Sequence, residues 1–356
     1  MIGPVREYEP YEWKTPRRMD QSMDYFLGVD GGASSTTCAV ATADGAVVGI
    51  GHAGPSNHIL APGGRERARA AVGGAVGHAL AAAGLGAVAF RAAQFGMTGI
   101  TRDTEQARVF ATVVAETLAA AIVQIDNDAV IARAGALAGR PGVIVIAGTG
   151  SVAFGEDPGG KQARAGGWGY IFGDEGSGFA IGCGAVRAAL HAYDGTGDPT
   201  VLVARISDAA GMPLTDIPMA FYEGRIDRSK IAALSREVSR AAEERDAVAQ
   251  RLIDEAAAGL ARLVAAVIAT LRWPDGPVAV GPVGGVFDAG RIFLKPLGEA
   301  LARTAPPAVL VPPRLAPAAG GVLLAMRAAG VPLAPPVLAL LAATWELRRA
   351  GAPAGA

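Results

Sequence analysis

The sequence predicts an α/β protein made of two related domains. Two apolar strands, one near residue 27 and one near residue 145, are each followed by a glycine-rich turn with hydroxyl side chains and then by a second strand. Strand-like runs alternate with helical patterns around them. The length of 356 residues, of which 51% are hydrophobic, suffices for two domains with sizeable cores.

We expect a first domain at residues 24–140 and a second at 141–335. Helix 336–349 is expected to pack back on the first domain, and residues 1–23 to form a flexible extension. The first hairpin runs from Phe26 through a turn at Asp44-Gly45 to Ile50. The further strands are expected at 92–97, 121–125, 143–147, 152–155, 278–280 and 309–311. The helices are expected at 65–83, 104–118, 130–137, 228–240, 244–273, 318–329 and 336–349.

The first turn contains glycines and hydroxyl residues, namely Gly31, Gly32, Ser34, Ser35 and Thr36. Glycines allow the backbone to approach a phosphate closely, and adjacent N–H groups and hydroxyls can donate to its oxygens. Asp30 precedes this turn, and a carboxylate there could hold a metal ion or its water shell. An ordinary hairpin turn is the alternative interpretation.

The second turn, Gly148, Thr149, Gly150 and Ser151, follows the apolar run Val143–Ala147. A continuous apolar run is typical of a strand buried on both faces. Ligands gather at the carboxyl ends of such strands. A tight β-turn without a ligand is the alternative, but a second turn of the same kind favours phosphate binding.

Asp128 follows the predicted strand Ala121–Ile125, at the start of a helix. A carboxylate in this place can accept the proton of a substrate hydroxyl, as phosphoryl transfer requires. Asp126 is its rival, and either residue could simply cap the helix.

Residues 166–178 combine glycines with three aromatic residues, Trp168, Tyr170 and Phe172, and two acids, Asp174 and Glu175. An apolar ring face and carboxylate acceptors suit the recognition of a sugar. We expect these rings to avoid joint exposure, which would leave an apolar patch.

Gly284 and Gly285 precede Phe287 between a strand and a helix, where bare backbone could lie against a nucleobase and ribose. Helix-entry glycines that serve packing are the alternative.

The net charge of −1, from 32 basic and 33 acidic residues, gives no sign of a nucleic-acid partner. Cys38 and Cys183 are far apart and match no metal-binding spacing. No apolar segment has the length of a membrane span. We expect a cytoplasmic protein without a membrane partner.

Together these segments resemble the BadF/BadG/BcrA/BcrD ATPase group and, within it, the N-acetylglucosamine kinase-like sugar kinases of the actin/hexokinase/Hsp70 superfamily. The resemblance covers residues 25–329. It implies two ribonuclease-H-like domains with a nucleotide cleft between them.

The resemblance also implies the roles of site residues. Asp30 and the first turn would bind the β- and γ-phosphates and Mg²⁺, the second turn the phosphates, and Gly284, Gly285 and Phe287 the adenosine. Asp128 would be the base. The sugar pocket would include Asn57, Asp128, Thr149, Gly167, Trp168 and Asp174.

The resulting hypothesis is an ATP-dependent kinase, a homodimer, that phosphorylates the 6-hydroxyl of N-acetylglucosamine or glucosamine. The alternatives are a nucleotide switch that only hydrolyses ATP and an activator subunit of the BadF/BcrA type. The activator branch carries cysteines for an iron–sulfur cluster, and this chain has none at suitable spacing.

Overall fold

The computed structural model describes residues 24–351, so the predicted extension at residues 1–23 lies outside the described residues. Internal contacts divide the chain into two compact units. The first unit comprises residues 24–128 and 321–351 of the described part, and the second comprises residues 129–320. Each contains one mixed five-stranded sheet, which confirms the predicted α/β class. The domain boundaries at residues 140 and 335 stay predictions.

The sheet of the first unit has the strand order β3-β2-β1-β4-β5. Strands β1, β2 and β3 are antiparallel neighbours, whereas β4 and β5 run parallel to β1. The predicted first hairpin is therefore confirmed. The strands are β1 (Tyr25–Gly31), β2 (Thr36–Thr42), β3 (Val47–Ala53), β4 (Ala89–Met97) and β5 (Ala119–Asn127).

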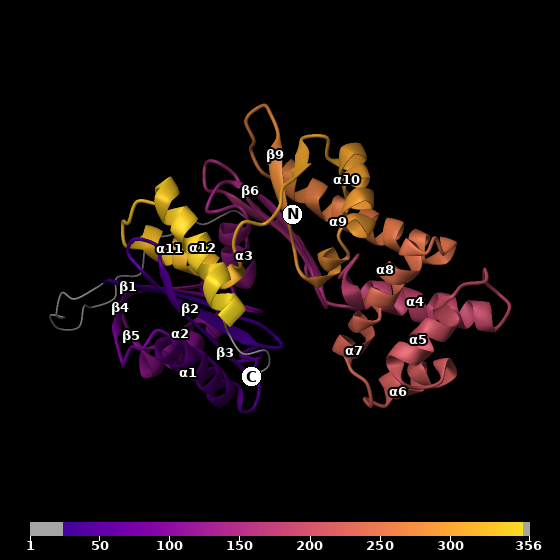
Figure 1. Ribbon diagram of the computed structural model, residues 1–356, viewed down its shortest axis with the longest axis horizontal. Helices are drawn as coiled ribbons and strands as arrows, with labels where there is room; N and C mark the ends of the chain where they lie inside the picture. The colour runs from indigo at the N-terminus through magenta and orange to yellow at the C-terminus, as the bar shows by residue number, and fades with distance from the viewer. Residues whose placement is uncertain (1–23, 352–356) are drawn as a thin grey trace. The chain divides into compact units, whose positions relative to one another are not determined.

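Four helices cover this sheet, with α1 and α2 on one side and α11 and α12 on the other (Figure 1). Helix α12 is tied to β3 because the N–H of Val47 donates to the hydroxyl of Thr344 at 2.9 Å. Thr104 caps α2, as predicted, by accepting from the N–H of Ala107. These helices are α1 (Gly64–Ala82), α2 (Glu105–Thr117), α11 (Pro317–Ala328) and α12 (Pro335–Gly351).

The sheet of the second unit has the order β10-β9-β6-β7-β8. Strands β9 and β10 are parallel to β6, and β7 and β8 form antiparallel pairs, which confirms the second predicted hairpin. The strands are β6 (Gly142–Ala147), β7 (Ser151–Glu156), β8 (Gln162–Gly166), β9 (Val278–Val283) and β10 (Ala308–Leu310).

Helix α9 packs on β6, β7 and β8, and α10 packs on α9 and β10, so the main core of this unit lies between the sheet and its helices. Helix α3 lies beside Ile144 and Gly281. The helices are α3 (Asp128–Ala136), α4 (Gly178–Tyr193), α5 (Leu202–Ala210), α6 (Ile217–Tyr222), α7 (Arg228–Ala233), α8 (Ser235–Glu243), α9 (Ala247–Thr270) and α10 (Arg291–Thr304).

The helices of residues 228–273 differ in detail from the prediction. The expected helix 228–240 is divided into α7 and α8 at Leu234, whose N–H bonds the carbonyl of Ile231 in a tightened turn. The expected start at residue 244 is too early, because Arg245 has φ 66° and the side chain of Asp246 caps α9. Strand β8 and helices α4 to α6 were not predicted.

None of the helices in the range 24–351 combines the length and the hydropathy that a membrane span needs.

The first unit depends on a close approach of α1 to β3. A Cβ built on Gly51 in β3 would overlap the carbonyl oxygen of Ala75 in α1. The backbone of α1 occupies the position that a side chain at residue 51 would need, and backbone cannot move aside as the end of a flexible side chain can. Gly77, also in α1, has no neighbour within 4 Å of such a Cβ.

We therefore expect Gly51→Ala to lower the free energy of unfolding by about 1–3 kcal/mol, because α1 must move away from the sheet. The matched control Gly77→Ala is expected to raise it by up to about 1 kcal/mol, because alanine loses less backbone entropy in a helix. Urea unfolding of both variants measures the difference. Equal effects of the two substitutions would contradict the packing argument.

Candidate active site

The first glycine turn joins β1 to β2 at the carboxyl end of β1. It closes with a hydrogen bond of 2.8 Å from the N–H of Gly32 to the carbonyl of Ser35. Ser34 and Ser35 are exposed, so their hydroxyls are available to a ligand. Thr36 is buried, and its hydroxyl donates to the carbonyl of Gly54 at 2.9 Å. Thr36 thus holds the sheet together, and Ser34 and Ser35 are the accessible hydroxyls of this turn.

A buried hydroxyl lies behind this turn. Ser56 is 1% exposed, and its Oγ has no hydrogen-bond partner among the described residues. A Cβ on Gly31 would lie 2.7 Å from this Oγ, and the N–H of Ser56 donates to the carbonyl of Gly32. The adjacent Asn57, a predicted sugar ligand, is half-buried. The structure therefore brings Asn57 and Ser56 to the first turn.

Two carboxylates, Asp30 and Asp128, lie at the carboxyl ends of β1 and β5, on either side of the end of β4. The N–H of Thr98, just after β4, donates to the carbonyl of Gly31, and the hydroxyl of Thr98 donates to Oδ2 of Asp128 at 2.5 Å. Burial and, second, the charge of Asp128 raise the pKa of Asp30 to about 7. A cation or a proton at this place would relieve both causes.

Asp128 is the first residue of α3 and follows β5 without an intervening loop. A carboxylate in the first turn of a helix is stabilised by the positive end of the helix dipole. The place of Asp128 at the helix start is as predicted, and its role as the base stays a prediction.

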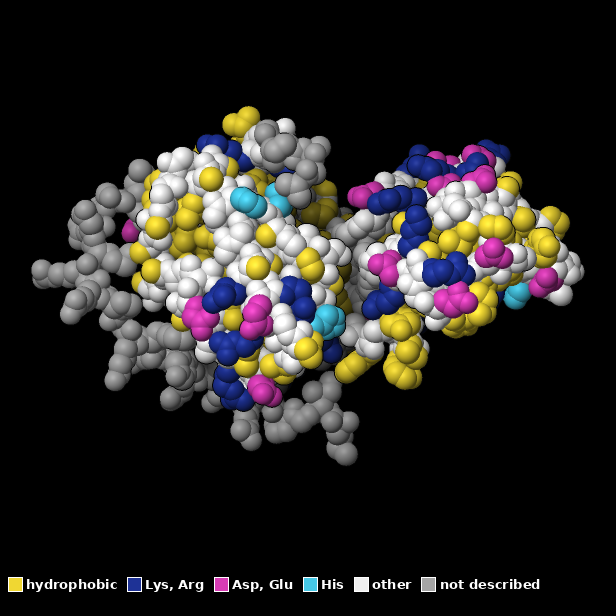
Figure 2. Space-filling model, turned by 90° about the horizontal axis from the view of Figure 1, so that it is seen from below, with side chains coloured by type: hydrophobic (Ala, Val, Ile, Leu, Met, Phe, Trp, Pro, Cys, Tyr) yellow, Lys and Arg dark blue, Asp and Glu magenta, His cyan; other side chains and the backbone are white. Residues whose placement is uncertain are grey.

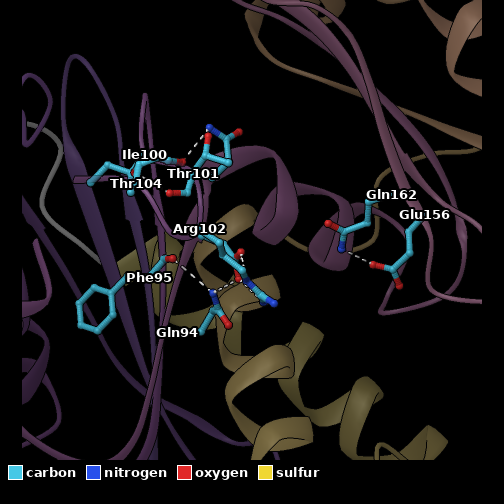
Figure 3. Close-up of polar contacts among 10 residues, drawn as sticks. Gln94, Phe95, Ile100, Thr101, Arg102, Thr104, Glu156 and Gln162 are labelled. Atoms are coloured by element: carbon cyan, nitrogen blue, oxygen red, sulfur yellow. Dashed lines mark hydrogen bonds and ion pairs between the residues drawn. The ribbon is translucent and has the colours of Figure 1, made fainter. Parts of the chain in front are cut away.

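The rival Asp126 is engaged in other contacts. It is buried, Arg102 contacts both of its carboxylate oxygens, and the amide of Gln94 donates to Oδ2 at 3.2 Å. Figure 3 shows the side chains of Gln94 and Arg102 converging, and a second bond from the Gln94 amide to the Phe95 carbonyl. Both carboxylate oxygens of Asp126 are therefore engaged by neighbouring side chains.

The second glycine turn lies at the carboxyl end of β6. Its geometry depends on Asp174, whose Oδ1 accepts from the N–H of Ser151 at 3.2 Å. The hydroxyl of Ser151 donates to the carbonyl of Glu175 at 2.7 Å, and so serves the loop and not a ligand. Gly148 and Thr149 are half-buried and complete the turn.

Gly284 lies beside this turn. It has φ 111°, and a Cβ there would lie 2.5 Å from the carbonyl oxygen of Ala147, the last residue of β6. Gly284 and Gly285 are exposed, and Phe287 packs edge-on against Phe293 at 5.6 Å between ring centroids. The predicted adenosine glycines and the second glycine turn are thus neighbours within the second unit.

Residues 166–178, here named the aromatic loop, contradict one expectation. Trp168 is 69% exposed and Phe172 83%, and Tyr170 and Ile171 are exposed as well. Hydrophobic side chains beside basic ones are visible on the surface of both units in Figure 2. The expectation that these rings avoid joint exposure was wrong, because positive φ at Gly167 and Gly169 lets the loop leave the core.

Asp174 itself is buried, at 4% exposure, and pairs with Arg228 at 3.4 Å. Asp174 also holds the second turn, and its role as a sugar ligand stays a prediction. Arg228, Ser56, Thr98 and Arg102 were not predicted as site residues. Arg228 is 54 residues from Asp174, and no spacing signal in the sequence joins the two.

A cavity of about 410 Å³ lies elsewhere in the second unit, between α4 and α9, with Arg187, His191 and Glu255 among its lining residues. None of the predicted phosphate, adenosine or sugar residues lines it.

The chain is similar to known sugar kinases. An N-acetylmuramic acid/N-acetylglucosamine kinase of Clostridium acetobutylicum is 34% identical over 75% of this chain and 86% of its own length. A glucosamine kinase of Vibrio cholerae is 30% identical over 58% of this chain and 64% of its own length. The crystal structure of a structural genomics target from Chromobacterium violaceum aligns with a TM-score of 0.69 at 27% identity, covering 85% of this chain and 99% of that one.

The model of one family matches residues 27–325, which include both glycine turns, Asp128 and the aromatic loop. The chain belongs to the BadF/BadG/BcrA/BcrD ATPase family.

Proposed function

We propose that this protein is an ATP-dependent kinase that transfers a phosphoryl group to the 6-hydroxyl of an amino sugar, N-acetylglucosamine or glucosamine. The relatives act on sugars of this class, as their names state. The observation that carries the proposal is Asp128, a carboxylate at a helix start, close to Asp30 and with Thr98 bound to it.

In the proposed reaction, Asp128 accepts the proton of the attacking sugar hydroxyl. Thr98 orients the carboxylate, since its hydroxyl donates to Oδ2. Phosphoryl transfer needs little covalent chemistry from the protein, so positioning and charge stabilisation supply most of the rate. The exposed hydroxyls of Ser34 and Ser35 and the backbone of the second turn are assigned to the phosphates, and Gly284, Gly285 and Phe287 to the adenosine.

Mg²⁺ fits the first turn by the chemistry of its donors. Asp30 is a half-buried carboxylate whose pKa is raised by burial and by the charge of Asp128, and Ser56 adds an unpartnered buried hydroxyl. Across residues 24–351 no cluster of three or more His, Cys, Asp or Glu forms a cage for a metal. Mg²⁺ takes one or two carboxylates and completes its shell with water and phosphate oxygens. Asp30 would hold the ion, which would offset the negative charge of the phosphates.

Asp128→Asn tests the proposal. We expect kcat for sugar-stimulated ADP release to fall by about 10²–10⁴-fold, because the amide cannot accept the proton. Binding of ATP, measured by calorimetry, should change little. ADP release with and without N-acetylglucosamine or glucosamine gives the baseline, and equal rates for the wild type would favour the ATPase-only switch.

Asp126→Asn is the matched control for this experiment. It removes a neighbouring carboxylate that is bound to Arg102. It should therefore lower the free energy of unfolding and leave kcat close to the wild-type value. The assignment of the base fails if Asp126→Asn abolishes turnover and Asp128→Asn leaves it intact.

The pKa of Asp30 predicts a pH dependence of stability in the metal-free protein. Its folded-state pKa of about 7 lies above the ordinary value of 3.8, so between these values the native state holds a proton that the unfolded chain has released. The free energy of unfolding should therefore decrease as the pH rises from about 4 to about 7, because the native state must give up this proton. In Asp30→Asn this decrease should be absent.

Urea unfolding in the presence of a chelator, across the same pH range, measures the effect. Asp44→Asn is the control, since Asp44 is exposed and its hydrogen bond with Thr42 lowers its pKa. That variant should keep the fall seen in the wild type. An Asp30→Asn variant that also keeps the full fall would show that other groups cause it.

A further inference from the structure

The cavity of about 410 Å³ between α4 and α9 is lined by none of the residues assigned above to ATP or to the sugar. Small and apolar residues of both helices form its floor, among them Gly184, Ala188, Leu252 and Ala256. Their short side chains leave a hollow open between two helices that pack against each other. The volume of this hollow is within the range of small-molecule sites in proteins.

Five titratable side chains surround this floor. They are Arg187 and His191 from α4, Glu255 and Arg262 from α9, and Glu175 from the aromatic loop, and all five are exposed. Across residues 24–351 none of these side chains makes a hydrogen bond or an ion pair. Two arginines and two glutamates thus face one hollow without pairing across it. A ligand that carries both an anionic group and hydrogen-bond donors can pair with both kinds.

The α4 side of the cavity suits a phosphate. Arg187 and His191 are four residues apart on this helix, so they lie on the same face of it. Guanidinium and imidazole N–H groups both donate to phosphate oxygens, and arginine does so in a planar fork. Glu255, on the opposite helix, is an acceptor for hydroxyl and ammonium groups.

Glu175 connects the cavity to the second glycine turn. Its side chain lines the cavity, and its carbonyl accepts from the hydroxyl of Ser151 at 2.7 Å. The next residue, Gly176, packs so closely on α9 that a Cβ there would lie 2.4 Å from the carbonyl oxygen of Ala256. The segment is thus held between the helix and the turn. A ligand that draws Glu175 into the cavity pulls on the bond that shapes this turn, and a looser turn holds phosphates less well.

We propose that this cavity binds a phosphorylated amino sugar, the product of the proposed reaction, and that the bound product weakens the binding of ATP. The inference rests on the proposed function and adds a second site to it. The phosphate pairs with Arg187 and His191, and the hydroxyl and amino groups pair with Glu255 and Glu175. A nucleotide also carries phosphate, but among the described residues no Phe, Tyr or Trp lines the cavity to stack on a base.

The test is calorimetric titration of the full chain with glucosamine 6-phosphate, while an excess of N-acetylglucosamine fills the sugar site. The wild type is compared with Arg187→Gln and Glu255→Gln. Arg251→Gln is the matched control, because Arg251 is an exposed residue of α9 that pairs with Asp198 and does not line the cavity. Glucose 6-phosphate, which lacks the amino group, glucosamine, which lacks the phosphate, and AMP are the comparison ligands.

Glucosamine 6-phosphate should bind to the wild type more tightly than the three comparison ligands. Arg187→Gln should raise its Kd by about 10–100-fold, the range for a lost charge-assisted pair. Glu255→Gln should reduce the preference for glucosamine 6-phosphate over glucose 6-phosphate. Arg251→Gln should bind as the wild type does.

Kinetics measure the link between the two sites. Added glucosamine 6-phosphate should raise the KM for ATP of the wild type by about 5-fold or more, the usual size of coupling between two sites. Arg187→Gln should lose this rise and keep the kcat that the wild type has without added product, since Arg187 lies outside the candidate active site.

Other results would overturn the inference. An equal Kd in the wild type and Arg187→Gln, or no binding at all, would refute it and leave the proposed function standing. Tighter binding of AMP would indicate a nucleotide site, and a changed oligomeric state of Arg187→Gln in gel filtration would indicate that a second copy covers the cavity.

Failure of the proposed function has a different signature. A wild type without sugar-stimulated ADP release would refute the kinase reaction, whereas a raised Kd in Arg187→Gln would still establish the site. Arg187 and Glu255 are exposed, so both variants should fold, which thermal unfolding checks. If Arg187→Gln does not fold, an unchanged ligand preference in Glu255→Gln would overturn the inference.

Discussion

The hydrogen bond from the N–H of Thr98 to the carbonyl of Gly31 is the interaction on which the candidate site of the first unit depends. It joins the ends of β4 and β1 and so fixes Thr98, whose hydroxyl holds Asp128. Asp128 is thereby held where its negative charge acts on Asp30. This charge, together with burial, disfavours the ionised form of Asp30 and raises its pKa. A site that binds a cation and a phosphate can use this arrangement, because the ligand removes the repulsion that the empty fold sustains.

A single carboxylate plays the corresponding part in the second unit. Asp174 has φ 61°, a conformation that non-glycine residues rarely adopt, and its side chain is turned toward the second glycine turn. By accepting from the N–H of Ser151, it makes the geometry of that turn depend on the aromatic loop. The same carboxylate is also the anchor for Arg228. A change in the aromatic loop would therefore alter the second glycine turn, through the contacts of Ser151 with Asp174 and Glu175.

Much of the fold could be predicted because it follows from local patterns. The apolar run Val143–Ala147 and the glycines after it marked a buried strand and its turn, and the structure has both. The long helix predicted at residues 244–273 begins later in the structure, at Ala247. The hydrophobic periodicity does not reveal the positive φ of Arg245, which delays the start of the helix. The expected concealment of Trp168 and Phe172 failed because the positive φ of Gly167 and Gly169, which carries the loop away from the core, cannot be read from hydrophobicity.

The sequence by itself determined the family, the two strand–turn–strand units and the residue types available for phosphate, base and sugar recognition, since these depend on order and spacing along the chain. Only the tertiary structure decided which of these side chains are free for chemistry. Asp126 is bound by Arg102, and Thr36 by the backbone of Gly54. Such pairings join residues far apart in the chain, and the free energy of a hydrogen bond depends on the partner that folding supplies.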